Sequence, residues 1–440
     1  MDEWRFKSAL EQGAAIGAGA VDPVALTQAY LDAIAAHPHG SRIYARTTPG
    51  RALAEAAAAR DRARDGVRRG PLDGVAVSWK DLFDTAGTAT EAGSALLAGR
   101  VPDADADVLA AASAAGLVCL GKTHMSELAF SGLGYNPVTA TPPCVNDEAA
   151  IAGGSSSGAA ASVAFGLAAA AVGSDTGGSV RIPAAWNDLV GFKTTIGSLP
   201  MGGVVPLCAR FDTLGPLTRT VADAAAVWSA IGGQDVDLGA VSLAGRRFAV
   251  VEDVALEDLE PVVQSAFEES LTRIEAAGAK VDRVSLPEVS ALIALAPLLY
   301  APEAYGAWKD VIEAAPDKMF AEIRERFRGG ADVSAPDYVA ALQEMARLRD
   351  AIWAQLGGYD AMLVPASPIL PPKMADVEDG GDVYKRANLM ALRNTRIGNM
   401  TDAASVTVPS GVASCGVMLI GPGGSDARML RLAAALEAAF

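Results

Sequence analysis

Three side chains that could carry out nucleophilic catalysis stand in unusual settings in this chain. Lys80 directly follows the apolar run Gly74-Val-Ala-Val-Ser-Trp79. Ser155 lies inside Gly153-Gly-Ser-Ser-Ser-Gly158, and Ser179 closes Gly173-Ser-Asp-Thr-Gly-Gly-Ser179. A serine hydroxyl is a poor nucleophile unless a base takes its proton, and a lysine kept neutral by burial can act as that base. The three residues therefore indicate serine chemistry that runs on a lysine base.

Histidine, the usual base of serine hydrolases, is nearly absent. The segment Gly154-Ser-Ser-Ser-Gly158 matches the G-x-S-x-G turn of α/β-hydrolases, a fold in which the catalytic histidine follows the serine in the chain. The chain has three histidines, and the last of them is His124. A triad of that order is therefore excluded by composition alone.

Each candidate also has an ordinary interpretation. Taken alone, Lys80 is better explained as a solvated lysine at a strand end, paired with Asp81 or Asp84. Burial would instead lower its pKa by up to about 3–5 units. The two glycines before Ser179 would let successive N–H groups face one bound oxygen, as in an oxyanion hole, but they could equally form a plain turn. The segment 153–158 could be a flexible surface loop.

One segment matches a nucleotide-binding motif in sequence but not in its expected structure. Gly116-Leu-Val-Cys-Leu-Gly-Lys122-Thr123 fits the phosphate-loop pattern G-x-x-x-x-G-K-[ST]. In that motif the residues between the glycines form a loop whose N–H groups surround the phosphate. Here they are apolar and follow a predicted helix, so a buried strand explains them better.

Composition narrows the class of ligand. The net charge of −16 disfavours nucleic acid, which needs a basic binding surface. The four cysteines form no C-x-x-C pair and the histidines have no metal-ligand spacing, so we expect neither a structural zinc site nor a disulfide scaffold. The charged N-terminus and the lack of a 20-residue apolar run predict a cytoplasmic protein without a membrane span. A small neutral ligand fits best.

Strand and helix signals alternate along the chain, which predicts an α/β fold. We expect a turn at 121–123 and a loop over 139–152. The expected helices cover about 23–37, 51–64, 107–115, 125–131, 156–167, 259–277 and most of 289–355, and the expected strands cover 75–79, 117–120, 168–172, 248–251, 280–284, 362–364, 405–408 and 416–420.

Together the three motifs resemble those of the amidase signature family of Ser-Ser-Lys amidohydrolases. The lysine motif corresponds to 73–81, the glycine-serine motif to 153–158, and the Gly-Ser-Asp-Thr-Gly-Gly-Ser-x-Arg-x-Pro-Ala motif to 173–184. The intervals, 75 residues from Lys80 to Ser155 and 24 from Ser155 to Ser179, are also those of the family.

The resemblance implies one amidase signature domain over 1–440, with a central mixed β-sheet flanked by helices on both sides. Within it we expect N-terminal helices over 1–60, the catalytic core over 61–240, a variable elaboration over 241–400, and closing strands and a helix over 401–440.

The resemblance also assigns roles to individual residues. Ser179 would be the acyl-enzyme nucleophile, Ser155 the bridging serine after a cis peptide bond, and Lys80 the final base. Backbone groups of Thr176, Gly177, Gly178 and Ser179 would hold the oxyanion. Ala129 would complete the substrate site. No metal or organic cofactor is implied.

The implied activity is hydrolysis of a small-molecule carboxamide, at a linear amide C–N bond, to an acid and ammonia or an amine. Two alternatives stay open: the glutaminase subunit of a tRNA-dependent amidotransferase, and an allophanate- or ureide-type hydrolase. Ile182 stands where the glutaminase subunit typically has Gln, which favours the stand-alone amidase.

The sequence leaves open which amide is the substrate, whether the chain forms a homodimer, and whether it needs a partner subunit. We expect the substrate loops at about 125–145, 185–210 and 295–345. Phe130, Tyr135, Trp186 and Tyr300 are candidates for an apolar acyl pocket, or for core.

Overall fold

The computed structural model describes residues 1–239 and 241–440. Its strands are β1 Tyr44–Thr47, β2 Ala76–Lys80, β3 Val118–Thr123, β4 Pro143–Cys144, β5 Asp147–Ile151, β6 Ala170–Asp175, β7 Val190–Lys193, β8 Thr213–Thr218, β9 Arg247–Val251, β10 Lys280–Val284, β11 Ala361–Pro365, β12 Ala404–Pro409 and β13 Gly416–Gly421.

Eleven of these strands form one mixed sheet in the order β1-β3-β2-β6-β8-β7-β12-β13-β11-β9-β10. The ladders β3-β2-β6 and β11-β9-β10 are parallel, and the strands between them pair antiparallel. Strands β4 and β5 form a separate hairpin. The predicted α/β fold with a large central mixed sheet is confirmed.

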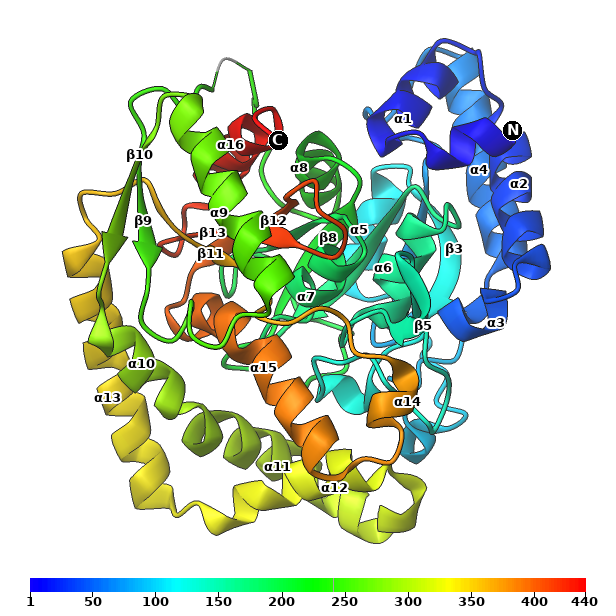
Figure 1. The fold of residues 1–440 in the computed structure, drawn as a ribbon. Helices are drawn as coiled ribbons and strands as arrows, with labels where there is room; N and C mark the ends of the chain where they lie inside the picture. Colours follow the sequence, from blue (N-terminus) through cyan, green and yellow to red (C-terminus); the bar gives the residue numbers. More distant parts are fainter. Residues whose placement is uncertain (240) are drawn as a thin grey trace.

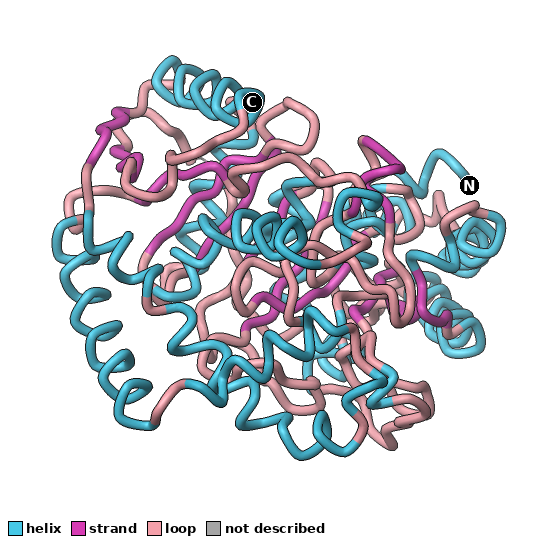
Figure 2. The backbone as a smooth tube through the Cα atoms, turned by 60° about the horizontal axis from the view of Figure 1, so that its bottom comes forward, coloured by secondary structure: helices cyan, strands magenta, loops and turns pink. Residues whose placement is uncertain are grey.

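Helices surround this sheet (Figures 1 and 2). The α-helices are α1 Ala9–Gly17, α2 Pro23–Ala36, α3 Gly40–Ile43, α4 Pro49–Arg64, α5 Asp107–Ala114, α6 Ser157–Ala164, α7 Arg181–Trp186, α8 Val221–Ala230, α9 Pro261–Ala276, α10 Pro287–Ala294, α11 Ala296–Ala314, α12 Ala321–Arg328, α13 Ala335–Gln355, α14 Met374–Val377, α15 Gly381–Met400 and α16 Asp426–Glu437. The 3₁₀ helices are η1 Asp2–Phe6, η2 Ala95–Leu97, η3 Glu127–Ala129, η4 Pro316–Lys318 and η5 Gly329–Asp332.

Two groups of helices lie on opposite sides of the molecule. In Figure 1 the N-terminal helices α1–α4 lie on one side, and α10–α13 form an arc on the other. The segment Pro287–Ala314 is long and apolar enough to cross a membrane by length and composition. It is broken between α10 and α11, which pack against α13, α15 and α12. In this structure the segment belongs to the layer of helices formed by α10–α13.

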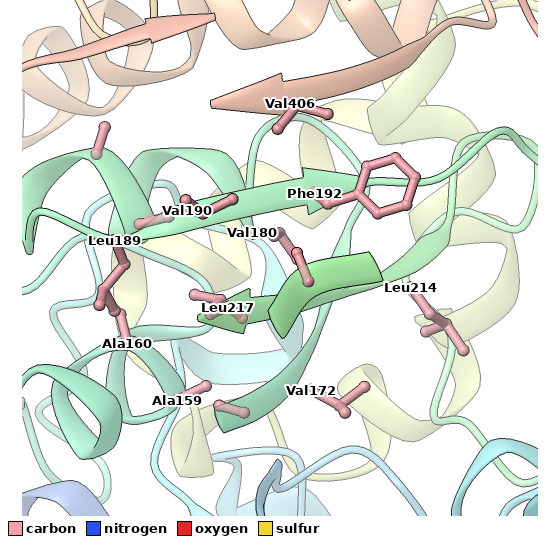
Figure 3. Packing of buried hydrophobic residues seen from close by; sticks show 14 of the residues in the cluster. Ala159, Ala160, Val172, Val180, Leu189, Val190, Phe192, Leu214, Leu217 and Val406 are labelled. Carbon is pink, nitrogen blue, oxygen red and sulfur yellow. The ribbon is translucent and has the colours of Figure 1, made fainter. Parts of the chain in front are cut away.

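The core is densest around the middle of the sheet. Figure 3 shows side chains of β6, β8, β7 and β12 packed together, among them Val172, Leu217, Phe192 and Val406. Helix α6 lies against β6, β2, β3 and β8. Its residues are nearly all Ala, Ser or Gly and are buried, so its backbone can approach the sheet closely. This close packing fixes the loop that leads into α6.

Several sequence predictions need correction. The segment 139–152 is a hairpin rather than a loop, and 125–131 contains only the short helix η3. Residues 121–123 are not a turn but the end of β3, where Gly121 has φ +149°. A Cβ at Gly121 would lie 2.4 Å from the carbonyl oxygen of Arg46 on the neighbouring strand. The glycine thus serves strand pairing, and the segment is no phosphate loop.

Candidate active site

Lys80 is the last residue of β2, which runs between β3 and β6. Its side chain is fully buried. The Nζ atom donates to Ser155 Oγ at 2.7 Å and to Ser174 Oγ at 2.8 Å. Asp81 pairs instead with Arg46 and Lys122, and Asp84 pairs with Arg100. The ordinary interpretation of Lys80, a solvated lysine paired with its neighbours, is therefore wrong.

The surroundings of Lys80 favour its neutral form. Burial lowers the pKa of its ammonium to about 7. The charges of Asp175 and Asp212 oppose this fall, but neither carboxylate lies within 4 Å of Nζ. Because Nζ contacts hydroxyl oxygens rather than a carboxylate, it can act as a base near neutral pH.

Ser155 lies in the turn that precedes α6. Its peptide bond with Gly154 is cis, as the family resemblance implies. The Gly154 N–H donates to the carbonyl of Gly132 at 2.8 Å, and the Ser126 N–H donates to the carbonyl of Ser155 at 3.1 Å. The turn is thus tied on both sides to the 126–132 segment. The flexible-loop interpretation is wrong, since Ser155 is fully buried.

Ser179 lies in the turn between β6 and α7 and is 3% exposed. The Ser156 N–H donates to its carbonyl oxygen at 3.2 Å, so this turn is joined to the one that carries Ser155. The structure thus places all three predicted residues in one region, with Lys80 and Ser155 in direct contact.

Asp175 holds the Ser179 turn in shape. Its carboxylate accepts from the N–H groups of Gly178 and Val180 at 2.9 and 3.1 Å, and it forms a buried ion pair with Arg181. Burial alone would raise the pKa of Asp175, but the charge and hydrogen bonds of Arg181 lower it to about 2. The turn is therefore built around a carboxylate that stays ionised.

The N–H groups around Ser179 fall into two sets. The Gly178 N–H, expected to face an oxyanion, donates to Asp175 instead. Within residues 1–239 and 241–440, no acceptor is found for the N–H groups of Gly177 and Ser179. The hydroxyl of Thr176 donates to Asp212 at 2.6 Å. Two unpaired N–H groups beside a serine are suited to bind a developing oxyanion.

A small cavity opens at Ser179. It is lined by Ala129, Phe130, Ser131, Thr176, Gly177, Ser179, Leu207, Tyr300, Arg326, Leu392 and Arg396. Of the predicted aromatic residues, Phe130 and Tyr300 line it. Tyr135 and Trp186 belong to a separate hydrophobic cluster and are core.

Sequence reasoning missed four polar residues of the site: Ser131, Ser174, Arg326 and Arg396. Ser174 lies inside the Gly173–Ala184 motif, so it could have been considered as a site residue; in the structure it contacts Lys80. The two arginines lie on helices more than 140 residues further along the chain, and no local pattern marks them. In the part of the chain that the structure describes, no cluster of three or more His, Cys, Asp or Glu side chains could hold a metal ion.

Comparison with known proteins identifies the family. The family model for Amidase matches residues 25–430. The chain belongs to the Amidase family. Among its relatives, the 2-amino-5-chloromuconic acid deaminase of Comamonas testosteroni is 34% identical, over 89% of this chain and 87% of the relative.

Another relative is part of a larger assembly. A glutamyl-tRNA(Gln) amidotransferase subunit from Acidothermus cellulolyticus is 32% identical, over 99% of this chain and 94% of the relative. A crystal structure of an amidase superposes on this chain with a TM-score of 0.89 at 30% sequence identity. The superposition covers 98% of this chain and 99% of the amidase chain. The chain is thus an amidohydrolase-type enzyme that acts on C–N bonds, and it has the fold of that amidase.

Proposed function

We propose that this enzyme hydrolyses a small-molecule carboxamide to a carboxylic acid and ammonia or an amine, through an acyl-enzyme on Ser179. The observation that carries the proposal is the 2.7 Å contact between the buried Nζ of Lys80 and the hydroxyl of Ser155. It joins a base that can be neutral to a serine whose turn is hydrogen-bonded to the Ser179 turn.

Acylation begins with a proton moving along the three side chains. Neutral Lys80 accepts the proton of Ser155, which accepts the proton of Ser179 as Ser179 Oγ attacks the amide carbon. The N–H groups of Gly177 and Ser179 bind the oxyanion, with Thr176 and Ala129 beside it in the cavity wall. Ser155 then gives a proton to the leaving nitrogen.

Deacylation repeats the same transfers with water. Water attacks the ester carbon of the acyl-enzyme while Ser155 and Lys80 take its proton, and Ser179 leaves with a proton as the acid is released. Over the cycle one water is consumed and one C–N bond is broken. The residues need no metal or organic cofactor for any of these steps.

The glutaminase subunit of an amidotransferase is the second candidate, supported by the relatives that carry the amidotransferase name. Ile182 argues against it. Its side chain is buried with Leu133, Trp186 and Leu392 in an apolar cluster, so this position offers no amide to a glutamine substrate. The deaminase relative supports a third possibility, C–N cleavage on an unsaturated amino acid derivative. An allophanate- or ureide-type hydrolase also stays open.

The proposal is tested by labelling with a fluorophosphonate probe, followed by ammonia release from a panel of aliphatic, aromatic and ureido amides. Ser179→Ala should abolish labelling and lower kcat/KM by at least ~1000-fold, because the nucleophile is removed. Ser157→Ala is a matched control, since its hydroxyl donates to the carbonyl of His124 instead. Labelling that persists in Ser179→Ala would refute the assignment.

A further inference from the structure

The cavity at Ser179 continues into a larger one. Four residues line both: Phe130, Tyr300, Arg326 and Arg396. They come from the C-terminal end of η3, from α11, from α12 and from α15. These four side chains therefore form the neck that a substrate must occupy or pass to reach the nucleophile.

The two arginines of the neck have no carboxylate partner among residues 1–239 and 241–440. Other arginines of α12 do: Arg324 pairs with Glu325, and Arg328 pairs with Glu313. Arg326 lies 4.4 Å from the ring centre of Phe130, and Arg396 lies 5.7 Å from that of Tyr300. Aromatic faces hold the cations but do not neutralise them.

Two half-buried guanidinium groups that share one cavity are unfavourable without an anion. Burial, and then the charge of Arg396, lower the pKa of Arg326 to about 9. Arg326 therefore still carries its charge at neutral pH. An anion placed between the two groups would relieve both the repulsion and the desolvation, and a planar carboxylate matches the fork of guanidinium donors.

A third side chain that lines the neck, Tyr300, also has a polar group without a partner among the described residues. The hydroxyl of Tyr300 is buried and makes no hydrogen bond within the described part of the chain, while its ring is stacked on Phe211 at 4.3 Å. Tyr300 is 6% exposed, and burial raises the pKa of its hydroxyl, which keeps it protonated. A buried O–H donor without an acceptor is rare, and a bound water, ion or ligand can supply the acceptor.

Among the described residues, no acidic side chain lines the inner cavity beside these donors. The outer cavity has Glu322 and Glu325, but Glu322 accepts from the Gly381 N–H and Glu325 from Arg324 and Arg328. The neck thus offers binding to an anion and none to an ammonium group.

We propose that the substrate's acyl chain carries a carboxylate, bound by Arg326 and Arg396 with the Tyr300 hydroxyl as a third donor. The substrate class is the monoamide of a short dicarboxylic acid, rather than a neutral amide or an α-amino acid amide. This inference rests on the proposed function. Water replaces the amide nitrogen at the acyl carbon, ammonia leaves, and a dicarboxylate is the product.

The first test compares the monoamides of succinic and glutaric acid with butyramide and with glutamine, which adds an ammonium group. Wild type should prefer the monoamides over butyramide and over glutamine. Arg326→Met and Arg396→Met should each lower the kcat/KM ratio of monoamide to butyramide by about 10- to 100-fold, as expected for a lost hydrogen bond to a charged group. Arg396→Lys should restore part of the ratio.

Arg324→Met and Arg386→Met are matched controls. Each removes one positive charge from the same helix as its counterpart, α12 or α15, but neither residue lines the cavities. Both should leave the ratio as in wild type. An equal loss of the kcat/KM ratio in the controls would mean that net charge, and not the neck, selects the substrate, and it would overturn the proposal. A wild-type preference for butyramide or glutamine would also overturn it.

A second test does not need turnover. Succinate and glutarate should bind to Ser179→Ala, measured by calorimetry, and should slow fluorophosphonate labelling of Ser179 in wild type. Arg326→Met and Arg396→Met should abolish both effects. Absence of binding would overturn the carboxylate site even if amides are hydrolysed. Binding without any labelling or hydrolysis would instead overturn the proposed function.

Discussion

The lowered pKa of Lys80 should be detectable in two independent measurements. Its pKa falls from the ordinary 10.5 to about 7 on folding. At pH 7 about half of the folded molecules would carry a neutral lysine, against roughly 1 in 3000 for an exposed lysine. Since only the neutral form is a base, kcat/KM should rise with pH, about tenfold per pH unit below 7, and level off above it.

The same proton affects stability. The unfolded chain keeps the lysine protonated up to pH 10.5, whereas the folded chain binds that proton only below about 7. Between these values the unfolded state holds more protons, so raising the pH stabilises the fold. The difference between the two pKa values corresponds to about 5 kcal/mol. Below pH 7, the charged and buried Lys80 lowers the free energy of unfolding by about this amount, and the loss has disappeared by pH 10.5.

Urea unfolding of wild type and Lys80→Met from pH 6 to 10 measures this cost. Methionine leaves Ser155 and Ser174 without their donor, but this loss is the same at every pH and cancels in the comparison. Wild type should gain about 4 kcal/mol relative to the variant between pH 7 and 10. Parallel stability curves would show that Lys80 is charged in the fold. An acid limb of kcat/KM far from pH 7 would then assign the base to another group.

Two other substitutions test the frame around the base and the nucleophile. Ser174→Ala removes an acceptor that stabilises the Lys80 ammonium. The acid limb of kcat/KM should therefore move to lower pH, and kcat should fall about tenfold. An acid limb at the wild-type pH would mean that Ser174 does not influence the base. Gly178 has φ +136°, and a Cβ at this position would lie 2.1 Å from Thr395 Oγ1. Gly178→Ala should therefore lower the free energy of unfolding by about 2 kcal/mol or more, and the variant should no longer be labelled by the probe. Wild-type melting and labelling in that variant would contradict the geometry of the turn.

Lys80, Ser155 and Ser179 could be predicted as candidate site residues because each of them lies in a short sequence motif. The buried run before Lys80 and the glycine turns around Ser155 and Ser179 each mark their residue locally. The arginines of the neck are different. Arg326 is one of three arginines in Ala321-Glu-Ile-Arg-Glu-Arg-Phe-Arg328, a segment whose pattern is typical of a solvated helix. Only the packing of α12 against α11 decides which of them faces the cavity.

One of the strands that were missed, β8, carries residues that usually argue against a strand. β8 contains Gly215 and Pro216, yet lies between β6 and β7 inside the sheet. Proline is tolerated there because β7 pairs with β8 only at Val190 and Gly191, opposite Thr218 and Leu217. Gly215 is needed because a Cβ would lie 1.8 Å from the carbonyl of Phe192. Such exceptions depend on neighbours that a single sequence does not reveal.

The order of the sheet has a consequence for how the chain is made. In the large sheet, strands β1, β2, β3, β6, β7 and β8 connect to β9, β10 and β11 only through β12 and β13, which come last in the sequence. During synthesis both parts therefore expose an unpaired strand edge until residue 421 has left the ribosome. A frameshift or stop before β12 would leave those edges open for good. Its product should be cleared by chaperones and proteases as an aggregating chain, even though Lys80, Ser155 and Ser179 are all present in it.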